Sequence, residues 1–107
     1  MDKKQLKSLL EGGDDEQIKT EIEKLSSWIE LNGKTVDELS EVIDLLGLDL
    51  VKFEKFNLLI KHGVKPQKAK KALELDSDDL KLAEKYQKAM LSLEWNTYCK
   101  NKLEESL

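Results

Sequence analysis

A stripe of four apolar residues near the amino-terminal end limits the fold of this chain more than any other feature. Isoleucine and leucine recur at intervals of four, three and four residues, at Ile18, Ile22, Leu25 and Ile29. This spacing places the four side chains on one face of an α-helix, whereas a strand would repeat every second residue. The chain also has only one Pro and five Gly, which argues against a protein with many β-turns. We therefore predict an all-α fold.

The pairs Gly12-Gly13 and Asn32-Gly33 predict where the first two helices end. Leucines at helical spacing predict a short helix over residues 2–11, which Gly12-Gly13 ends. The apolar stripe predicts a second helix over about 15–31. We expect this helix to stop at Asn32-Gly33, because both residues readily adopt the left-handed conformation that closes many helices.

The residues after Gly33 have the pattern of a new helix start. Thr35 and Glu38 have the spacing of a capping box, in which each side chain accepts a hydrogen bond from the other residue's backbone amide. The apolar positions that follow are Val36, Leu39, Ile43 and Leu46, widened by Val42 and Leu45. A stripe of this width predicts a third helix that is buried on more than one side.

Two shorter helices are predicted on either side of Gly63. Asp49 is the expected N-cap of a helix that ends at His62-Gly63. Pro66 suits the first position of the next helix, which we expect to cover about 66–74. The residues predicted to face inward from it are Ala69, Ala72 and Leu73.

A long final helix is predicted from residue 77 to residue 105, with Asp76 or Ser77 as its cap. Its length would be about 43 Å, and we expect its end to project from the rest of the chain. That end would offer a contact surface made of Trp95, Tyr98, Leu103 and Leu107. The whole prediction is a single-domain bundle of five to six helices with a long C-terminal helix.

Length and composition support one small domain over residues 1–107. No apolar run approaches the roughly 18 residues that cross a bilayer, so no membrane association is expected. The single cysteine, Cys99, cannot form an internal disulfide, and a cytoplasmic location is therefore expected.

The residues needed for catalysis or metal binding are sparse. His62 and Cys99 are the only residues of their types and lie on different predicted helices. His62 is interpreted as a helix-end residue, where a partly charged imidazole is favourable. The acidic run 76–79 begins like a calcium loop but lacks its glycine, and it is interpreted as a helix start. We propose no catalytic residue, metal ligand or cofactor, and expect a protein that is not an enzyme.

Positive charge is concentrated in the centre of an acidic chain. Residues 52–73 hold seven Lys against Glu54, whereas the whole chain has a net charge of −4. The lysines that surround the predicted 66–74 helix are Lys61, Lys65, Lys68, Lys70 and Lys71. Together with Trp95 and Tyr98, these five are the candidate partner-binding residues. We name the five the lysine cluster.

The lysine cluster favours a protein partner with an acidic surface. Arg, the residue best suited to reading bases, is absent from the chain, and residues 61–75 contain no aromatic side chain for stacking on nucleic acid. Non-specific nucleic-acid binding is a less favoured alternative. Exclusive use of Lys is also typical of A/T-rich genomes, such as those of low-G+C bacteria and their phages.

The segment from Leu59 to Ala83 resembles a ubiquitin-associated-type (UBA-like) domain. Leu59-Ile60-Lys61-His62-Gly63-Val64 is similar to the first helix and loop of that family. Ala69, Ala72 and Leu73 match the Ala-x-x-Ala-Leu of its second helix, and Asp79-Leu80 and Ala83 match the start of its third. The resemblance implies a three-helix docking unit over about 50–90. The loop has no Met or aromatic residue, which makes ubiquitin an unfavourable partner.

A second resemblance concerns the two ends of the chain. LKSLLEGGDDEQIKTEIEKLSSWIE is similar to the opening of small helical head-to-tail connector proteins of tailed phages, and DLKLAEKYQKAMLSLEWNTY to their last helix. The leading hypothesis is nevertheless a helical adaptor or inhibitor that docks on another protein. A structural subunit of a larger assembly, such as a phage neck, is the alternative that the second resemblance implies.

Overall fold

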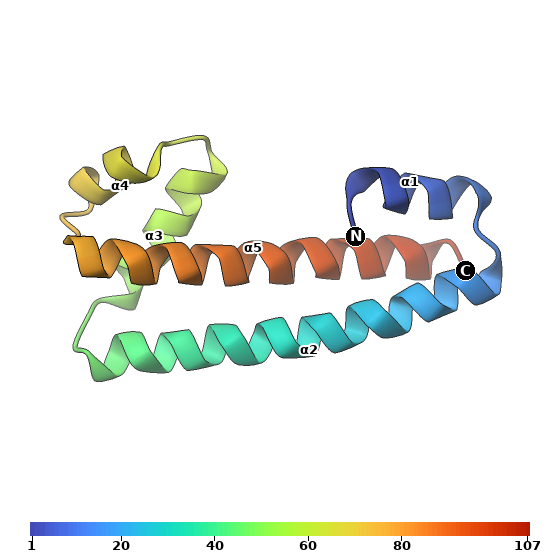
Figure 1. Ribbon diagram of the computed structural model, residues 1–107, viewed down its shortest axis with the longest axis horizontal. Coiled ribbons are helices and arrows are strands. Elements are labelled where there is room, and N and C mark those ends of the chain that lie inside the picture. Colours follow the sequence, from blue (N-terminus) through green and yellow to red (C-terminus); the bar gives the residue numbers. More distant parts are fainter. The chain divides into compact units, whose positions relative to one another are not determined.

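Five α-helices and no strand make up the regular structure of the chain (Figure 1). The computed structural model describes all 107 residues. The helices are α1 (Lys3–Gly12), α2 (Asp15–Leu45), α3 (Leu50–Lys61), α4 (Pro66–Ala72) and α5 (Ser77–Glu105). The predicted all-α bundle with a long C-terminal helix is confirmed, and the number of helices is five.

Aspartate followed three residues later by glutamine begins each of the first two helices. The Asp2 carboxylate accepts a hydrogen bond from the backbone amide of Gln5 at 2.8 Å, and the Gln5 side chain accepts one from the Asp2 amide at 2.9 Å. Asp14 and Gln17 repeat the arrangement at 2.8 and 3.2 Å. These reciprocal bonds satisfy amides that the first turn of a helix leaves without partners.

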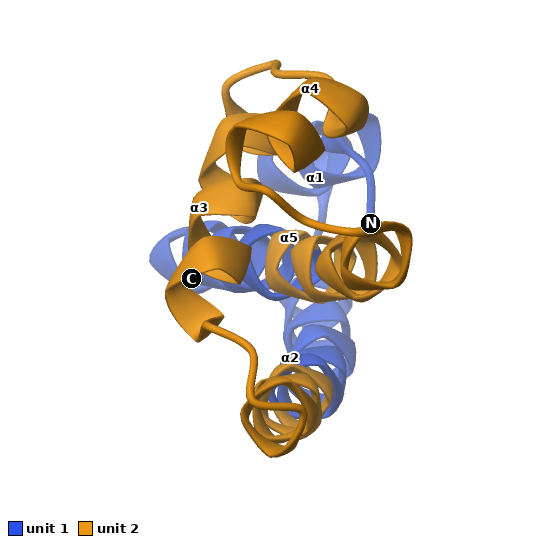
Figure 2. Cartoon of the chain, turned by 90° about the vertical axis from the view of Figure 1, so that its left-hand side faces the viewer, with its two compact units in different colours: residues 1–33, 92–107 blue, residues 34–91 orange.

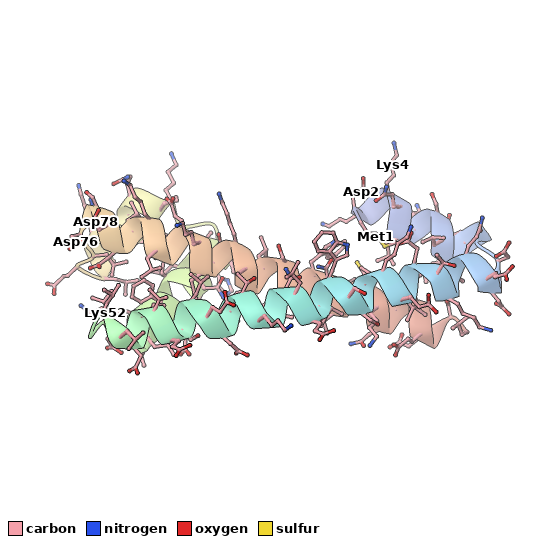
Figure 3. All side chains as sticks on the ribbon, turned by 60° about the horizontal axis from the view of Figure 1, so that its bottom comes forward. Met1, Asp2, Lys4, Lys52, Asp76 and Asp78 are labelled. Carbon is pink, nitrogen blue, oxygen red and sulfur yellow. The ribbon has the colours of Figure 1, made fainter.

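Single aspartate caps begin α3 and α5, as predicted. Asp49 accepts from the backbone amide of Val51 at 3.0 Å. Asp76 accepts from the amide of Asp79 at 2.7 Å (Figure 3 labels Asp76 at the start of α5). Pro66 occupies the first turn of α4, also as predicted.

One long helix, α2, replaces the predicted second and third helices. It runs for 31 residues through Asn32, Gly33 and Thr35, so the predicted stop and the predicted capping box are wrong. The backbone of Gly33 is not left-handed, since the only glycines with positive φ are Gly47 and Gly63. A glycine that remains helical costs the helix stability but does not end it.

The chain divides into two compact units that share α2 and α5 (Figure 2). Unit 1 comprises residues 1–33 and 92–107, and unit 2 comprises residues 34–91. Unit 1 contains α1 and parts of α2 and α5, whereas unit 2 contains α3, α4 and the remaining parts of those two helices.

The core of unit 1 includes the end of α5 that was expected to project. Cys99 and Leu103 are completely buried, together with Leu6, Ile18 and Leu25. The expectation is wrong because α1 and the first half of α2 supply apolar side chains that cover this end of α5.

The core of unit 2 is centred on two aromatic residues of α3, Phe53 and Phe56, which are at most 1% exposed. The other buried members are Ile43, Ala69, Leu75, Leu80, Ala83 and Tyr86. Ala69 faces inward and Leu73 packs on the core, as predicted. Ala72 is exposed, contrary to prediction: it lies three positions from buried Ala69 but is the last residue of α4.

Three apolar residues at or just after the end of α2 were predicted to be buried and are exposed instead. The exposed fractions are 41% for Val42, 78% for Leu45 and 63% for Leu46, whereas Ile43 is fully buried. A helix turns 100° per residue, so Leu45 lies far around the helix from Ile43. The wide apolar stripe suggested that a second helix would cover this side of α2. Within unit 2, no helix covers it.

Candidate functional site

The five residues of the lysine cluster all belong to unit 2. Lys61 ends α3, Lys65 immediately precedes α4, and the others lie on α4. Lys70 is half-buried and donates a hydrogen bond to the Ser77 hydroxyl at 3.2 Å, so it holds α4 to the start of α5. Ala69 is completely buried, so the opposite side of α4 faces outward.

Three members of the lysine cluster remain available to a partner. Lys65, Lys68 and Lys71 are exposed and form no ion pair within the chain. They offer amines on α4 and at its N-cap, and α4 carries no aromatic or other large apolar side chain beside them. Such a surface attracts acidic groups but gives little specificity.

The other two predicted residues, Trp95 and Tyr98, form a stacked pair in unit 1. They are three positions apart on α5, which places them on one face of the helix. Their ring centroids are 5.5 Å apart and the ring planes differ by 21°. The structure therefore brings the two aromatic residues together, but assigns them and the lysine cluster to different units.

Contacts within unit 1 fix the orientation of both rings. The Trp95 indole donates its only hydrogen bond to the backbone oxygen of Met1 at 2.6 Å. The Lys102 amine lies 5.8 Å from the centroid of the Tyr98 ring, within the range of a cation–π interaction. Because the indole nitrogen already donates to Met1, the rest of the Trp95 ring presents apolar surface to any ligand beside it.

An open groove lies between this aromatic pair and α1. Its volume is about 580 Å³, and its lining from α1 comprises Lys3, Leu6, Lys7, Leu10 and Glu11. Leu6 is buried, whereas Leu10 and Tyr98 are 40% and 49% exposed. The size is within the range of known ligand sites, and the apolar side chains supply the surface that such sites bury. We call this feature the α1–α5 groove.

The sequence reasoning found one wall of the α1–α5 groove and missed the other. Trp95 and Tyr98 were predicted as contact residues, but no residue of the first helix was. The missed signal is the spacing of Lys3, Lys7 and Leu10, which places amines beside the leucine face of α1.

A larger hollow, of about 710 Å³, lies at the corner between α1 and α2. Its lining includes Gly12, Gly13, Asp14 and Glu16, and Leu9 is its one large apolar side chain. The Asp14 carboxylate already accepts the hydrogen bond that caps α2. This corner therefore has a structural role and lacks the apolar anchors of the α1–α5 groove.

The two residues considered for nucleophilic chemistry lie in different units. His62 is exposed at the end of α3 in unit 2, and Cys99 is completely buried in unit 1. Burial raises the pKa of the Cys99 thiol, which is the opposite of what a reactive cysteine requires. No group of three or more His, Cys, Asp or Glu side chains is arranged to hold a metal ion.

The remaining findings concern membrane-spanning helices and similarity to known proteins. No helix has both the length and the apolar character needed to cross a membrane. The UBA-like and phage-connector resemblances stay predictions, as does the single-domain assignment of residues 1–107. Comparisons with family models, with curated proteins and with solved structures found no match to this chain.

Proposed function

We propose that this chain is a non-enzymatic helical protein-binding module, acting as an adaptor or inhibitor, and that it binds its partner in the α1–α5 groove. The observation that carries the proposal is the ordered aromatic pair beside exposed leucine. Trp and Tyr are enriched among the residues that dominate binding energy at interfaces. Leu10 and Tyr98 leave apolar surface in contact with water, which a partner would cover.

The aromatic wall of the α1–α5 groove, Trp95 and Tyr98, is held in place by contacts within the chain. The Trp95–Met1 hydrogen bond and the stacking on Tyr98 already restrict both rings. Less side-chain entropy is then lost on binding, and more of the contact energy contributes to affinity. We propose the cytoplasm as the location, because the chain contains a single cysteine and no pair that could form an internal disulfide.

The lysine cluster supports a second candidate surface for a partner with acidic groups. Lys65, Lys68 and Lys71 are exposed and without ion pairs. An acidic protein is favoured over nucleic acid, since the cluster includes neither Arg nor an aromatic residue. The role of structural subunit in a larger assembly, such as a phage neck, remains the alternative that the sequence resemblance suggests.

Reconstitution with a purified partner tests the groove. A partner captured by the tagged chain from an extract of its source organism would be identified by mass, purified, and titrated against the chain by calorimetry. We expect Leu10→Glu and Tyr98→Ala to weaken binding at least roughly tenfold, which is about 1.4 kcal/mol. Leu45→Gln, which changes an exposed leucine of unit 2, is the matched control and should bind normally.

Two results would contradict the proposal in different ways. Normal binding by Leu10→Glu, with loss of binding by a Lys65→Glu, Lys68→Glu, Lys71→Glu variant, would move the binding surface to the lysine cluster. If no protein is captured in stoichiometric amount, the chain is not a binding module. Thermal unfolding of each variant establishes that any loss of binding is not a loss of folding.

A further inference from the structure

The rim of the α1–α5 groove is basic although the chain as a whole is acidic. Lys3 and Lys7 line the groove from α1, and the Lys102 amine lies over the Tyr98 ring. Glu11 is the only acidic residue of the lining, whereas the chain carries a net charge of −4. The groove therefore combines an apolar floor with a rim of amines.

These amines are only partly neutralised within the chain. Lys3 is exposed and forms no ion pair. Lys7 lies 3.9 Å from Glu11, but the two side chains are 74% and 69% exposed, so water screens their attraction. Lys102 lies 3.7 Å from Glu105; neither residue belongs to the groove lining, and Lys102 is near the groove only through its contact with the Tyr98 ring. A ligand with carboxylates could replace these weak contacts.

The groove has the length and the side-chain spacing that suit a helix. Lys3, Lys7 and Leu10 extend over two turns of α1, about 10 Å along its axis. Trp95 and Tyr98 extend over one turn of α5 on the other side. A helix lying in such a groove contacts it through apolar residues at positions i, i+3 or i+4, and i+7. The Tyr98 hydroxyl forms no hydrogen bond within the chain and is available to the occupant.

We infer that the occupant of the α1–α5 groove is an acidic amphipathic helix of a partner protein. Its apolar side chains contact Leu6, Leu10 and Trp95, and its carboxylates contact the amines of Lys3 and Lys7. The inference rests on the proposed function and adds the chemistry of the partner: charge complementarity selects acidic helices from among those with a suitable apolar face.

Three synthetic peptides, each about four helical turns long, provide the test. The acidic leucine peptide has leucines at i, i+3, i+4 and i+7 and glutamates at its other positions. The lysine peptide has lysine in place of every glutamate. The serine peptide keeps the glutamates but has serine in place of every leucine. Binding to the full chain is followed by anisotropy of the labelled peptide. Trp28→Phe, at an exposed position, leaves Trp95 as the only tryptophan and its fluorescence as a second readout.

The acidic leucine peptide should bind at least roughly tenfold more tightly than the lysine peptide at about 0.05 M salt. The ratio of the two affinities should be smaller at about 0.5 M salt, because salt screens the attraction between the charges. The serine peptide should not bind. Lys3→Glu with Lys7→Glu should remove the preference for the acidic peptide. Lys65→Glu with Lys68→Glu makes the same change of charge in unit 2, and should leave the preference unchanged.

Each of the other outcomes contradicts a particular part of the inference. Equal binding of the acidic and lysine peptides, or tighter binding of the lysine peptide, overturns the acidic partner but leaves the groove as a helix-binding site. If no peptide binds and Trp95 fluorescence does not change, the groove does not bind acidic helices and the inference fails, whereas the proposed function is decided separately by the effect of Leu10→Glu on the captured partner. If sedimentation of the chain alone shows a dimer that Leu10→Glu dissociates, the occupant is a second copy of this chain.

Discussion

The Asn96 side-chain amide donates a hydrogen bond to the side-chain oxygen of Asn32 at 2.8 Å, across 64 positions of sequence. Both residues are half-buried in unit 1, one on α5 and the other on α2. A polar pair in an otherwise apolar helix contact fixes the register of two helices, at some cost in stability relative to an apolar pair. Asn32 was predicted to end a helix and instead joins two helices.

A double-mutant cycle on this pair should show energetic coupling. We expect Asn32→Ala and Asn96→Ala each to lower the free energy of unfolding by about 1 kcal/mol, since each leaves a half-buried amide without its partner. The double variant should lose less than the sum, with a coupling energy of about 0.5–1.5 kcal/mol. Urea denaturation measures all four proteins. Strictly additive losses would show that the hydrogen bond contributes nothing to stability.

The continuity of α2 was predictable from a longer window than the one that suggested two helices. Ile22, Ile29, Val36 and Ile43 are spaced seven residues apart, so the apolar face continues in register through Gly33. Local preference of Asn-Gly for a helix end competes with packing along the whole face, and packing prevails. Aspartate caps were predictable at Asp49 and Asp76, because a cap depends only on residues close in sequence.

Replacing Gly33 by alanine tests whether α2 is continuous. A Cβ added at Gly33 meets no atom within 4 Å, and the backbone there is helical. Gly33→Ala should therefore raise the free energy of unfolding by about 0.5–1 kcal/mol. Gly47 is equally unobstructed but has a φ of +71°, so Gly47→Ala should destabilise the protein by about 1–2 kcal/mol. A loss of stability from Gly33→Ala would indicate a helix end at that position.

Neighbouring apolar residues at the end of α2 should respond very differently to substitution. Ile43 is completely buried, so Ile43→Ala should cost about 2–5 kcal/mol. Leu45 is 78% exposed, and Leu45→Gln should change stability by less than about 0.5 kcal/mol. Chemical denaturation of the two variants makes the comparison. A large loss from Leu45→Gln would mean that this leucine is covered in the folded protein.

The candidate site could be predicted only in part, for a physical reason. Trp95 and Tyr98 stood out as large aromatic residues one helical turn apart at the end of a long helix. Which helix would pack beside them depends on contacts between residues far apart in sequence. The spacing of Lys3, Lys7 and Leu10 places these residues on one face of α1, but it does not specify what that face lies beside. The lysine cluster was evident from charge density alone, but its separation from the aromatic pair into another unit required the fold.

Glu74 is the one residue other than glycine with a positive φ, at 57°, and it follows the end of α4. The amide of Leu75 donates to the oxygen of Lys70 at 3.0 Å, which closes the helix in the manner usually assigned to glycine. Glu74→Gly should therefore raise the free energy of unfolding by about 0.5–1 kcal/mol, because it relieves the backbone strain. Glu74→Ala keeps the strain and serves as the control. Equal stability of both variants would show that the conformation is not strained.

Tyr86 gives the fold a sensitivity to alkaline pH. Burial raises the pKa of its hydroxyl, the Glu54 carboxylate raises it further, and a side-chain hydrogen bond with Ser40 acts in the opposite direction. A folded pKa above the unfolded value of about 10 means that the contribution of Tyr86 is complete below about pH 10. The contribution is lost as the pH rises from that value through the folded pKa, since the unfolded chain then releases the proton more readily.

Comparison of the chain with its Tyr86→Phe variant between about pH 8 and 11 isolates this effect. Both proteins should carry Cys99→Ala, because burial also raises the pKa of the Cys99 thiol and would add a second alkaline loss. Below about pH 10 the difference in stability between the chain with Tyr86 and the Tyr86→Phe variant should not change with pH. Above about pH 10 the stability of the chain with Tyr86 should fall relative to that of Tyr86→Phe, since phenylalanine has no proton to lose. Urea midpoints that fall in parallel over the whole range would show that Tyr86 ionises as easily in the folded chain as in the unfolded one.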